Sequence, residues 1–160
     1  MGWEVLYLRP RYEKKMALLC DIMGVEYYLP LRAETKVYQR RRVSVEKPVF
    51  PGYFFVSLNS IERPRLKRTD SVVRTLVPED ESKLLHELQQ IKLAMRVDCT
   101  LGAAKALKKG RRVRIKTGPF MGVEGVVWQR RSTKTVRLNV DLIGQAVVVD
   151  VDGELLEVIG

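Results

Sequence analysis

The residue types that most often carry chemistry are scarce in this chain, and none has a partner at a catalytic spacing. His86 is the single histidine of the 160 residues and lacks a serine, cysteine or metal ligand at a usable distance along the chain. Cys20 and Cys99 lie far apart without a CxxC motif, which argues against a zinc site and a disulfide framework. Neither a GxxxxGKS/T phosphate loop nor an HExxH helix occurs. We therefore expect no catalytic residue, no metal and no cofactor.

Lysine and arginine are the most abundant residues in this chain that could bind a ligand or partner through charge. The sequence holds 29 Lys and Arg against 19 Asp and Glu, a formal net charge of +10, which favours a polyanionic partner. The densest group is Arg40, Arg41 and Arg42. Three adjacent arginines repel one another unless an anion neutralises them, so we favour phosphate contact over a solvated loop. β-branched and aromatic residues flank this run over 35–45, which predicts an extended arm or hairpin with a basic tip.

The segments before this arm predict a β-α-β unit. Residues 3–8 are apolar apart from one glutamate and predict a buried strand. Apolar residues at helical spacing predict a helix from residue 11 that ends at Gly24. Residues 25–29 then return to strand chemistry before Pro30, which supplies no ladder donor.

The segments after the arm predict two more strands and two helices. Residues 49–58 are almost wholly apolar and predict a central strand that begins with a Pro-Gly kink. A short basic helix opens at Pro64, and 72–77 predicts a further strand. Residues 79–96 have an acidic start, an apolar stripe and a basic end, which together predict a long helix.

The C-terminal third has a different texture. Residues 98–109 lack a strong periodic signal and predict a flexible linker between independently oriented domains. Beyond Gly110, five short β-branched runs predict a small barrel. These runs are 113–116, 123–129, 135–140, 146–151 and 155–159. No window approaches the ~18 apolar residues of a membrane span, and the start of the chain lacks signal-peptide charge, so we expect a cytoplasmic protein.

Two segments resemble motifs of the NusG family of transcription elongation factors. Residues 46–56, which contain Phe50-Pro51-Gly52-Tyr53, are similar to the family's N-terminal (NGN) domain. Residues 110–127 are similar to a KOW motif, which alone would also fit ribosomal proteins. Both segments in this order span nearly the whole chain, and this conjunction is what carries the resemblance.

The resemblance implies an α+β protein with two domains. An NGN-like α/β sandwich would occupy residues 1–97 and a KOW, SH3-like five-stranded β-barrel residues 110–160, joined by a linker over 98–109. A specialised, operon-restricted paralogue of the RfaH-like or UpxY-like type is favoured because Pro48 precedes the signature, the chain is short and the barrel loop is altered. The density of valine predicts that the second domain rests as a barrel and not as a helical hairpin.

The function implied is that of a monomeric transcription elongation factor. It would bind RNA polymerase through its N-terminal domain and promote processive elongation and antitermination, while the barrel recruits other factors. It would be no enzyme and would contact no membrane. The alternative is a KOW-containing RNA-binding or ribosome-associated protein, and a nucleic-acid-modifying enzyme is a weaker third.

Site residues follow from matching positions. In the family, an aromatic patch docks on the polymerase clamp helices, and the matching residues are Tyr7, Phe50 and Tyr53. For Phe50, which lies beside Pro51 where the strand begins, we favour docking over core packing. The resemblance and the charge run together predict contact with nucleic acid, including the non-template DNA strand, by Arg9, Arg11, Lys14, Lys15, Arg40, Arg41, Arg42 and Arg68.

Two further positions differ from the family. Leu142-Ile143-Gly144-Gln145 resembles the Ile-Phe-Gly-Arg loop that contacts a ribosomal small-subunit protein and the termination factor Rho. Here Ile143 replaces the phenylalanine and Gln145 the arginine. Residues 62–64 replace the His-Thr-Thr element by which one specialised branch contacts the opposite pincer of the polymerase.

Overall fold

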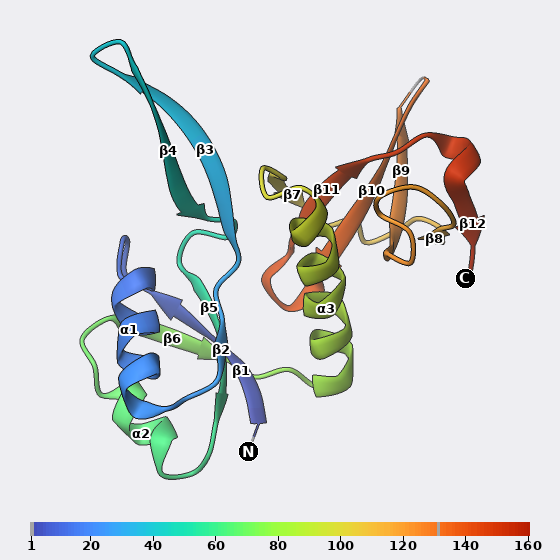
Figure 1. Cartoon of the computed structure of the whole chain (residues 1–160). Helices are drawn as coiled ribbons and strands as arrows, with labels where there is room; N and C mark the ends of the chain where they lie inside the picture. The colour runs from blue at the N-terminus through green and yellow to red at the C-terminus, as the bar shows by residue number, and fades with distance from the viewer. Residues whose placement is uncertain (1, 131) are drawn as a thin grey trace.

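A computed structural model describes residues 2–130 and 132–160 (Figure 1). Strands and helices alternate in its N-terminal part much as the sequence predicts. The elements are β1 (Gly2–Leu8), α1 (Glu13–Met23), β2 (Tyr27–Tyr28), β3 (Leu31–Tyr38), β4 (Arg41–Pro48), β5 (Tyr53–Leu58), α2 (Glu62–Lys67), β6 (Val72–Leu76) and α3 (Glu81–Val97). None of the helices within the described residues is long and apolar enough to cross a membrane.

The N-terminal sheet has the strand order β2-β5-β1-β6 and two apolar faces. Because side chains alternate along a strand, Leu6 and Phe54 point to one face, and Val5 and Phe55 point to the other. The first face packs against α1 and α2, and the second shares a core with the apolar stripe of α3. Figure 1 shows α1 and α2 on one side of this sheet and α3 on the other. This is the layered α/β arrangement expected from the sequence.

Strands β3 and β4 form a separate two-stranded sheet that projects from the rest of the chain (Figure 1). Gln39 and Arg40 connect them, and both have positive φ values, 45° and 67°. A two-residue loop with this backbone matches the right-handed twist of its strands. The predicted hairpin with a basic tip is confirmed.

The C-terminal part is a six-stranded antiparallel sheet with the order β12-β8-β9-β10-β11-β7. The five strands expected beyond Gly110 are found among the described residues as β8 (Arg112–Ile115), β9 (Glu124–Arg130), β10 (Thr133–Val140), β11 (Gln145–Asp150) and β12 (Leu156–Val158). Single-turn helices η1 (Asp141–Ile143) and η2 (Gly153–Leu155) connect the last three strands. Closure of this sheet as a KOW barrel stays a prediction.

The predicted flexible linker is wrong over 103–107. Residues Ala103–Lys105 form β7, which pairs with the otherwise free edge of β11. Leu107 follows, and its backbone N–H and C=O both bond the side-chain amide of Asn139, at 3.1 and 2.7 Å. Residues 103–105 carry no local sign of a strand because alanine and lysine have low β propensity. Backbone pairing with β11 therefore fixes residues 103–105 at the edge of the sheet.

Helix α3 lies between the two parts (Figure 1). One continuous apolar cluster contains residues of β1, β5 and α3 together with residues of β8, β10 and β11. The expectation that the domains orient independently is therefore wrong for this structure. The apolar stripe of α3 predicted that one face of the helix is buried. The polar face of α3 also makes contacts, with the C-terminal part of the chain.

Candidate functional site

Two tyrosines form an aromatic pair where β1 ends and β5 begins. Tyr7 and Tyr53 are directly opposite each other in the antiparallel register, and their ring centroids are 5.0 Å apart. The guanidinium carbon of Arg74 on β6 lies 5.3 Å from the Tyr7 ring centroid. Both tyrosines are half-buried. They present ring surface next to a cation, an arrangement common in protein–protein contacts.

Phe50 does not belong to this surface. Its side chain is only 1% exposed and packs edge-on against Phe55, with centroids 6.3 Å apart. The backbone N–H of Tyr53 donates to the carbonyl of Phe50 at 3.0 Å, which closes a tight turn. This turn leaves Pro51 exposed at the bend and folds the Phe50 ring inward. The prediction that Phe50 is exposed is wrong, and a partner can reach Tyr7 and Tyr53 but not Phe50 in this state.

The bend is held by a residue that the sequence analysis missed. Glu13, at the start of α1, is buried, and its Oε2 accepts a hydrogen bond of 2.9 Å from the backbone N–H of Gly52. Gly52 has a φ of 89°, and a Cβ there would lie 2.8 Å from Cε1 of Tyr7. Only glycine fits both this backbone and this ring. Nothing in the local sequence pattern around Glu13 indicates a contact with an amide 39 residues away.

Some of the expected nucleic-acid residues surround this bend. Arg11 and Lys14 line a pocket together with Tyr7 and Pro51. Lys14 also donates from Nζ to the carbonyl of Glu46 at 2.9 Å, which ties α1 to β4. The pocket therefore combines a half-exposed ring with two cations, and Glu13 and Glu46 also line it.

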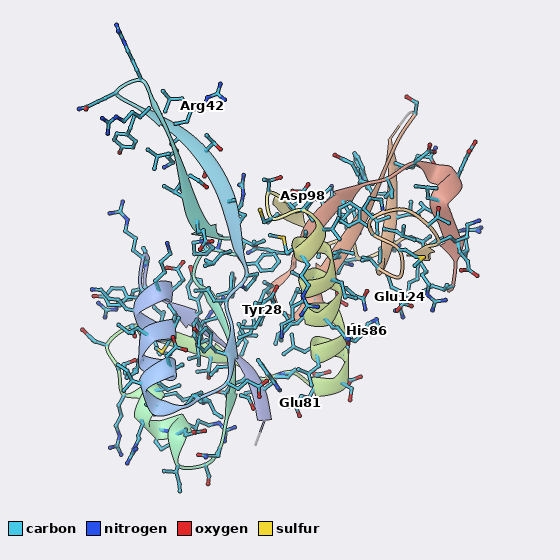
Figure 2. All side chains as sticks on the ribbon, in the orientation of Figure 1. Tyr28, Arg42, Glu81, His86, Asp98 and Glu124 are labelled. Carbon is cyan, nitrogen blue, oxygen red and sulfur yellow. The ribbon has the colours of Figure 1, made fainter. Side chains whose placement is uncertain are left out.

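The remaining basic residues lie in other places. Arg9 is exposed and lies 3.6 Å from Asp70, and Lys15 covers the ring of Tyr12 at 4.9 Å. Arg68 is exposed just after α2. Arg40, Arg41 and Arg42 lie at the far end of the hairpin, where Figure 2 labels Arg42. The predicted nucleic-acid residues thus do not form one patch: Arg11 and Lys14 lie at the bend, Arg40 to Arg42 lie at the hairpin tip, and the others are spread over the N-terminal part.

The elements that build this site lie in the part of the chain that matches a known protein family. A family model described as "Transcription termination factor nusG" matches residues 1–95, more than half of the chain. The chain belongs to the NusG family. No curated protein matches the chain. NusG proteins are transcription factors that act in elongation and termination, are not enzymes, and have RNA polymerase as their core partner.

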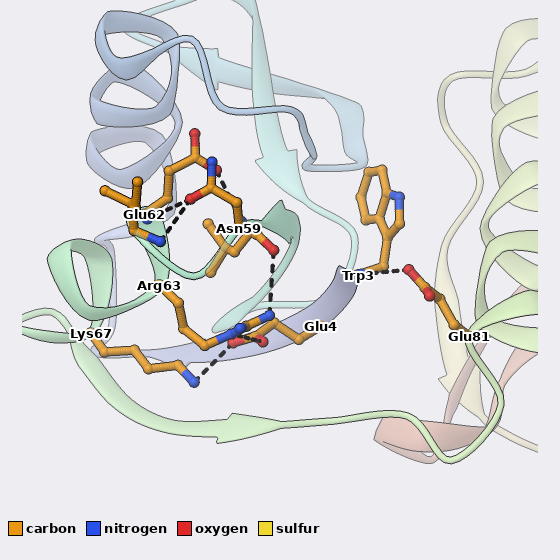
Figure 3. A network of polar contacts seen from close by, with 9 residues as sticks. Trp3, Glu4, Asn59, Glu62, Arg63, Lys67 and Glu81 are labelled. Carbon is orange, nitrogen blue, oxygen red and sulfur yellow. Dashed lines mark hydrogen bonds and ion pairs between the residues drawn. The ribbon is translucent and has the colours of Figure 1, made fainter. Parts of the chain in front are cut away.

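In this NusG-family chain, Arg63 within residues 62–64 binds a buried carboxylate of the N-terminal sheet. Glu4 on β1 is 2% exposed, and its Oε2 accepts a hydrogen bond of 2.9 Å from Nε of Arg63 (Figure 3). Nζ of Lys67 lies 3.1 Å from the other carboxylate oxygen, close enough for charge attraction but without an aligned hydrogen bond. Arg63 is therefore committed to anchoring α2 on the sheet.

Glu81 secures the start of α3 in the same view. Its Oε1 accepts a bond of 2.6 Å from the backbone N–H of Trp3 (Figure 3). A carboxylate in the first turn of a helix is also favoured by the helix dipole. Through this bond, the start of β1 is tied to the first turn of α3.

The predicted partner loop of the second domain lies against α3. Leu142 and Ile143 belong to η1, Ile143 is nearly buried, and Gly144 ends the turn with a φ of 67°. The neighbouring Asp141 forms an ion pair of 2.6 Å with Lys83 of α3. Gln145, in contrast, begins β11 and pairs with β7. The loop is thus partly engaged within the chain.

His86 also belongs to this interdomain contact. Its Nε2 lies 3.5 Å from Oε2 of Glu124 on β9, and Gln90 accepts a bond of 2.8 Å from the backbone N–H of Glu124 (Figure 2). Arg114 lies 3.2 Å from the same carboxylate. No group of three or more side chains with metal-binding geometry occurs among the residues described. His86 therefore lies at the contact between α3 and β9, with its side chain partly exposed.

Glu87 makes the interdomain contact sensitive to pH. Burial, followed by the charge of Asp141, raises the pKa of Glu87 from 4.5 to about 7. Because the folded-state pKa lies above the unfolded value, the folded chain binds the extra proton and loses stability as pH rises from about 4.5 to about 7. We expect Glu87→Gln to be more stable than the wild type at pH 8 and to lack this part of the slope.

Urea unfolding at several pH values from about 5 to 8 measures this difference. Glu79→Gln is the matched control, because Glu79 is an exposed glutamate just before α3. The difference between wild type and Glu87→Gln should grow with pH and should exceed the difference between wild type and Glu79→Gln. A difference for Glu87→Gln that does not change with pH would contradict the assignment.

Proposed function

We propose that this chain binds RNA polymerase through its N-terminal domain and promotes processive elongation and antitermination. The observation that carries the proposal is the Tyr7–Tyr53 pair, which lies half-exposed at the Pro-Gly bend within the family-matched region. Aromatic residues in such positions are frequent interface anchors. The clamp helices of the polymerase are the surface that this pair would contact, and Phe50 would act beneath it as a support.

The basic region near the bend would face the transcription bubble. Arg11 and Lys14 line the pocket beside Tyr7, and Arg9 directly follows β1, so polymerase docking would bring all three near DNA. Exposed Lys and Arg side chains bind phosphates without reading bases. Lys15 and Arg68 would therefore add affinity for the non-template strand and no sequence preference.

The C-terminal sheet would act as a KOW barrel that recruits further factors in the cytoplasm. Its partner loop, from Leu142 to Gln145, would bind a ribosomal small-subunit protein or Rho. Because Asp141 is paired with Lys83, such a partner would have to compete with α3 for this edge of the domain. The factor would work as a monomer.

A pausing and termination assay with purified RNA polymerase tests the proposal. Added protein should shorten pauses and increase read-through, and Tyr53→Ala should lose most of this effect. Ile22→Ala removes an exposed side chain from the end of α1, outside the aromatic pair and the hairpin, and should keep the effect. If the wild type changes neither pause lifetime nor read-through, the proposed function is wrong.

A further inference from the structure

The β3–β4 hairpin has two chemically different faces. Residues paired in an antiparallel ribbon point to the same side, and the side alternates along each strand. The register therefore gathers Arg32, Lys36, Tyr38, Arg41, Val43 and Lys47 on one face, here called the cationic face. Glu34 is the one acidic residue on it. The opposite face carries Arg42 and Glu46, whose charges balance.

The positive charge of the cationic face is not neutralised within the chain. Glu34 pairs with Lys47 at 3.1 Å, which accounts for one of the four cations. Lys36 contacts Lys47, and this contact lowers the pKa of Lys36. Nε of Arg32 is buried and has no hydrogen-bond acceptor among the described residues. Arg41 is exposed. Because Nε of Arg32 is enclosed and Lys47 is paired, Lys36 and Arg41 are the cations that an external anion would neutralise.

The turn at the tip of the hairpin is strained, and one of its two strained residues is an arginine. Gln39 and Arg40 both adopt positive φ, a conformation that costs a non-glycine residue about 1–2 kcal/mol. Asn-Gly would form the same turn without most of this cost. Strain of this kind is typical of functional positions, and here it places a further arginine at the end of the ribbon.

The dimensions of the hairpin select one class of nucleic acid. Two eight-residue strands make a ribbon about 27 Å long with strands about 4.8 Å apart. The major groove of B-form DNA, about 12 Å wide, admits a two-stranded ribbon, whereas that of double-stranded RNA is too narrow. Proteins that bind single strands use several stacking aromatics, and this face has only Tyr38.

We propose that the cationic face of the β3–β4 hairpin binds the phosphate backbone of duplex DNA, with the ribbon lying in the major groove. Arg41 and Lys36 contact phosphates, and Tyr38 packs beside them. The contacts position the protein and read no particular sequence. This interaction goes beyond the proposed function, because it needs no polymerase.

Fluorescence anisotropy of the full chain with a labelled duplex of about three helical turns tests the proposal. The test variant is Lys36→Ala/Arg41→Ala. The control is Arg65→Ala/Lys116→Ala, which removes the same charge from two exposed positions outside the hairpin. Thermal unfolding of each variant checks that the fold is kept.

The test variant should bind at least about tenfold more weakly than the wild type. Its salt slope should fall by about 1.8, which is about 0.9 for each phosphate that the variant no longer neutralises. The control should stay within about threefold. Equal weakening in the two variants would show that net charge alone acts and would overturn the proposal.

Other nucleic acids supply two more outcomes that would overturn the proposal. One is that the wild type does not bind the duplex at all. The other is that it binds single-stranded DNA or double-stranded RNA more tightly than the duplex. None of these results depends on polymerase binding, so the proposed function would stand or fall separately.

Discussion

Replacing Phe50 with alanine should lower the free energy of unfolding by about 3–5 kcal/mol. The side chain is 1% exposed and packs against Phe55 between the N-terminal sheet and the rest of the shared core. Its removal leaves a cavity that the surrounding strands cannot easily fill, because the turn from Phe50 to Tyr53 fixes the backbone. Urea unfolding followed by circular dichroism measures the change.

Tyr53→Ala is the comparison for Phe50. Tyr53 is half-buried, so its truncation should destabilise the fold clearly less than Phe50→Ala does. Phe50→Leu should recover more than half of the loss, because it retains much of the buried volume. A Phe50→Ala variant as stable as the wild type would mean that this ring is a surface residue after all.

Arg63→Ala should cost about 3 kcal/mol of unfolding free energy. The substitution leaves the carboxylate of Glu4 buried on β1 and removes its aligned hydrogen bond of 2.9 Å. It also removes a bond of 3.3 Å from Arg63 to the carbonyl of Leu58. Lys67 would still supply positive charge 3.1 Å away, which keeps the loss from being larger.

Two further variants on α2 serve as comparisons for Arg63→Ala, and urea unfolding measures the free energy of unfolding of all three. Lys67→Ala should cost less than Arg63→Ala, because its contact with Glu4 lacks an aligned hydrogen bond. Arg65→Ala, which changes an exposed arginine of α2, should stay within about 0.5 kcal/mol of the wild type. Equal effects for Arg63 and Arg65 would contradict a role for Arg63 in neutralising Glu4.

The secondary structure was largely predictable because its signals are local. The helix that ends at Gly24, the apolar stripe of α3 and the basic hairpin all rest on periodicity or turn chemistry within a few residues. Strand β7 was missed because alanine carries no strand signal, and its pairing depends on the free edge of β11. Edge pairing is a tertiary property that a single segment does not encode.

The candidate site was only partly predictable for the same reason. Tyr7, Phe50 and Tyr53 were all chosen by matching positions in the family, but the direction of the Phe50 side chain depends on how a turn folds back. The sequence pattern assigned no role to Glu13 or Glu87. Their partners, the amide of Gly52 and the domain beyond α3, are distant in the sequence. Long-range polar contacts of this kind leave no periodic trace.

The affinity of the purified chain for RNA polymerase, measured without nucleic acid, decides whether the aromatic pair is the docking surface. Tyr7→Ala and Tyr53→Ala should each weaken binding about thirtyfold, equivalent to about 2 kcal/mol for an interface anchor. Tyr38→Ala, which alters an exposed tyrosine on the hairpin, should bind like the wild type. Unchanged affinity in folded Tyr7 and Tyr53 variants, or no binding by the wild type, would contradict the claim that this pair docks on the polymerase.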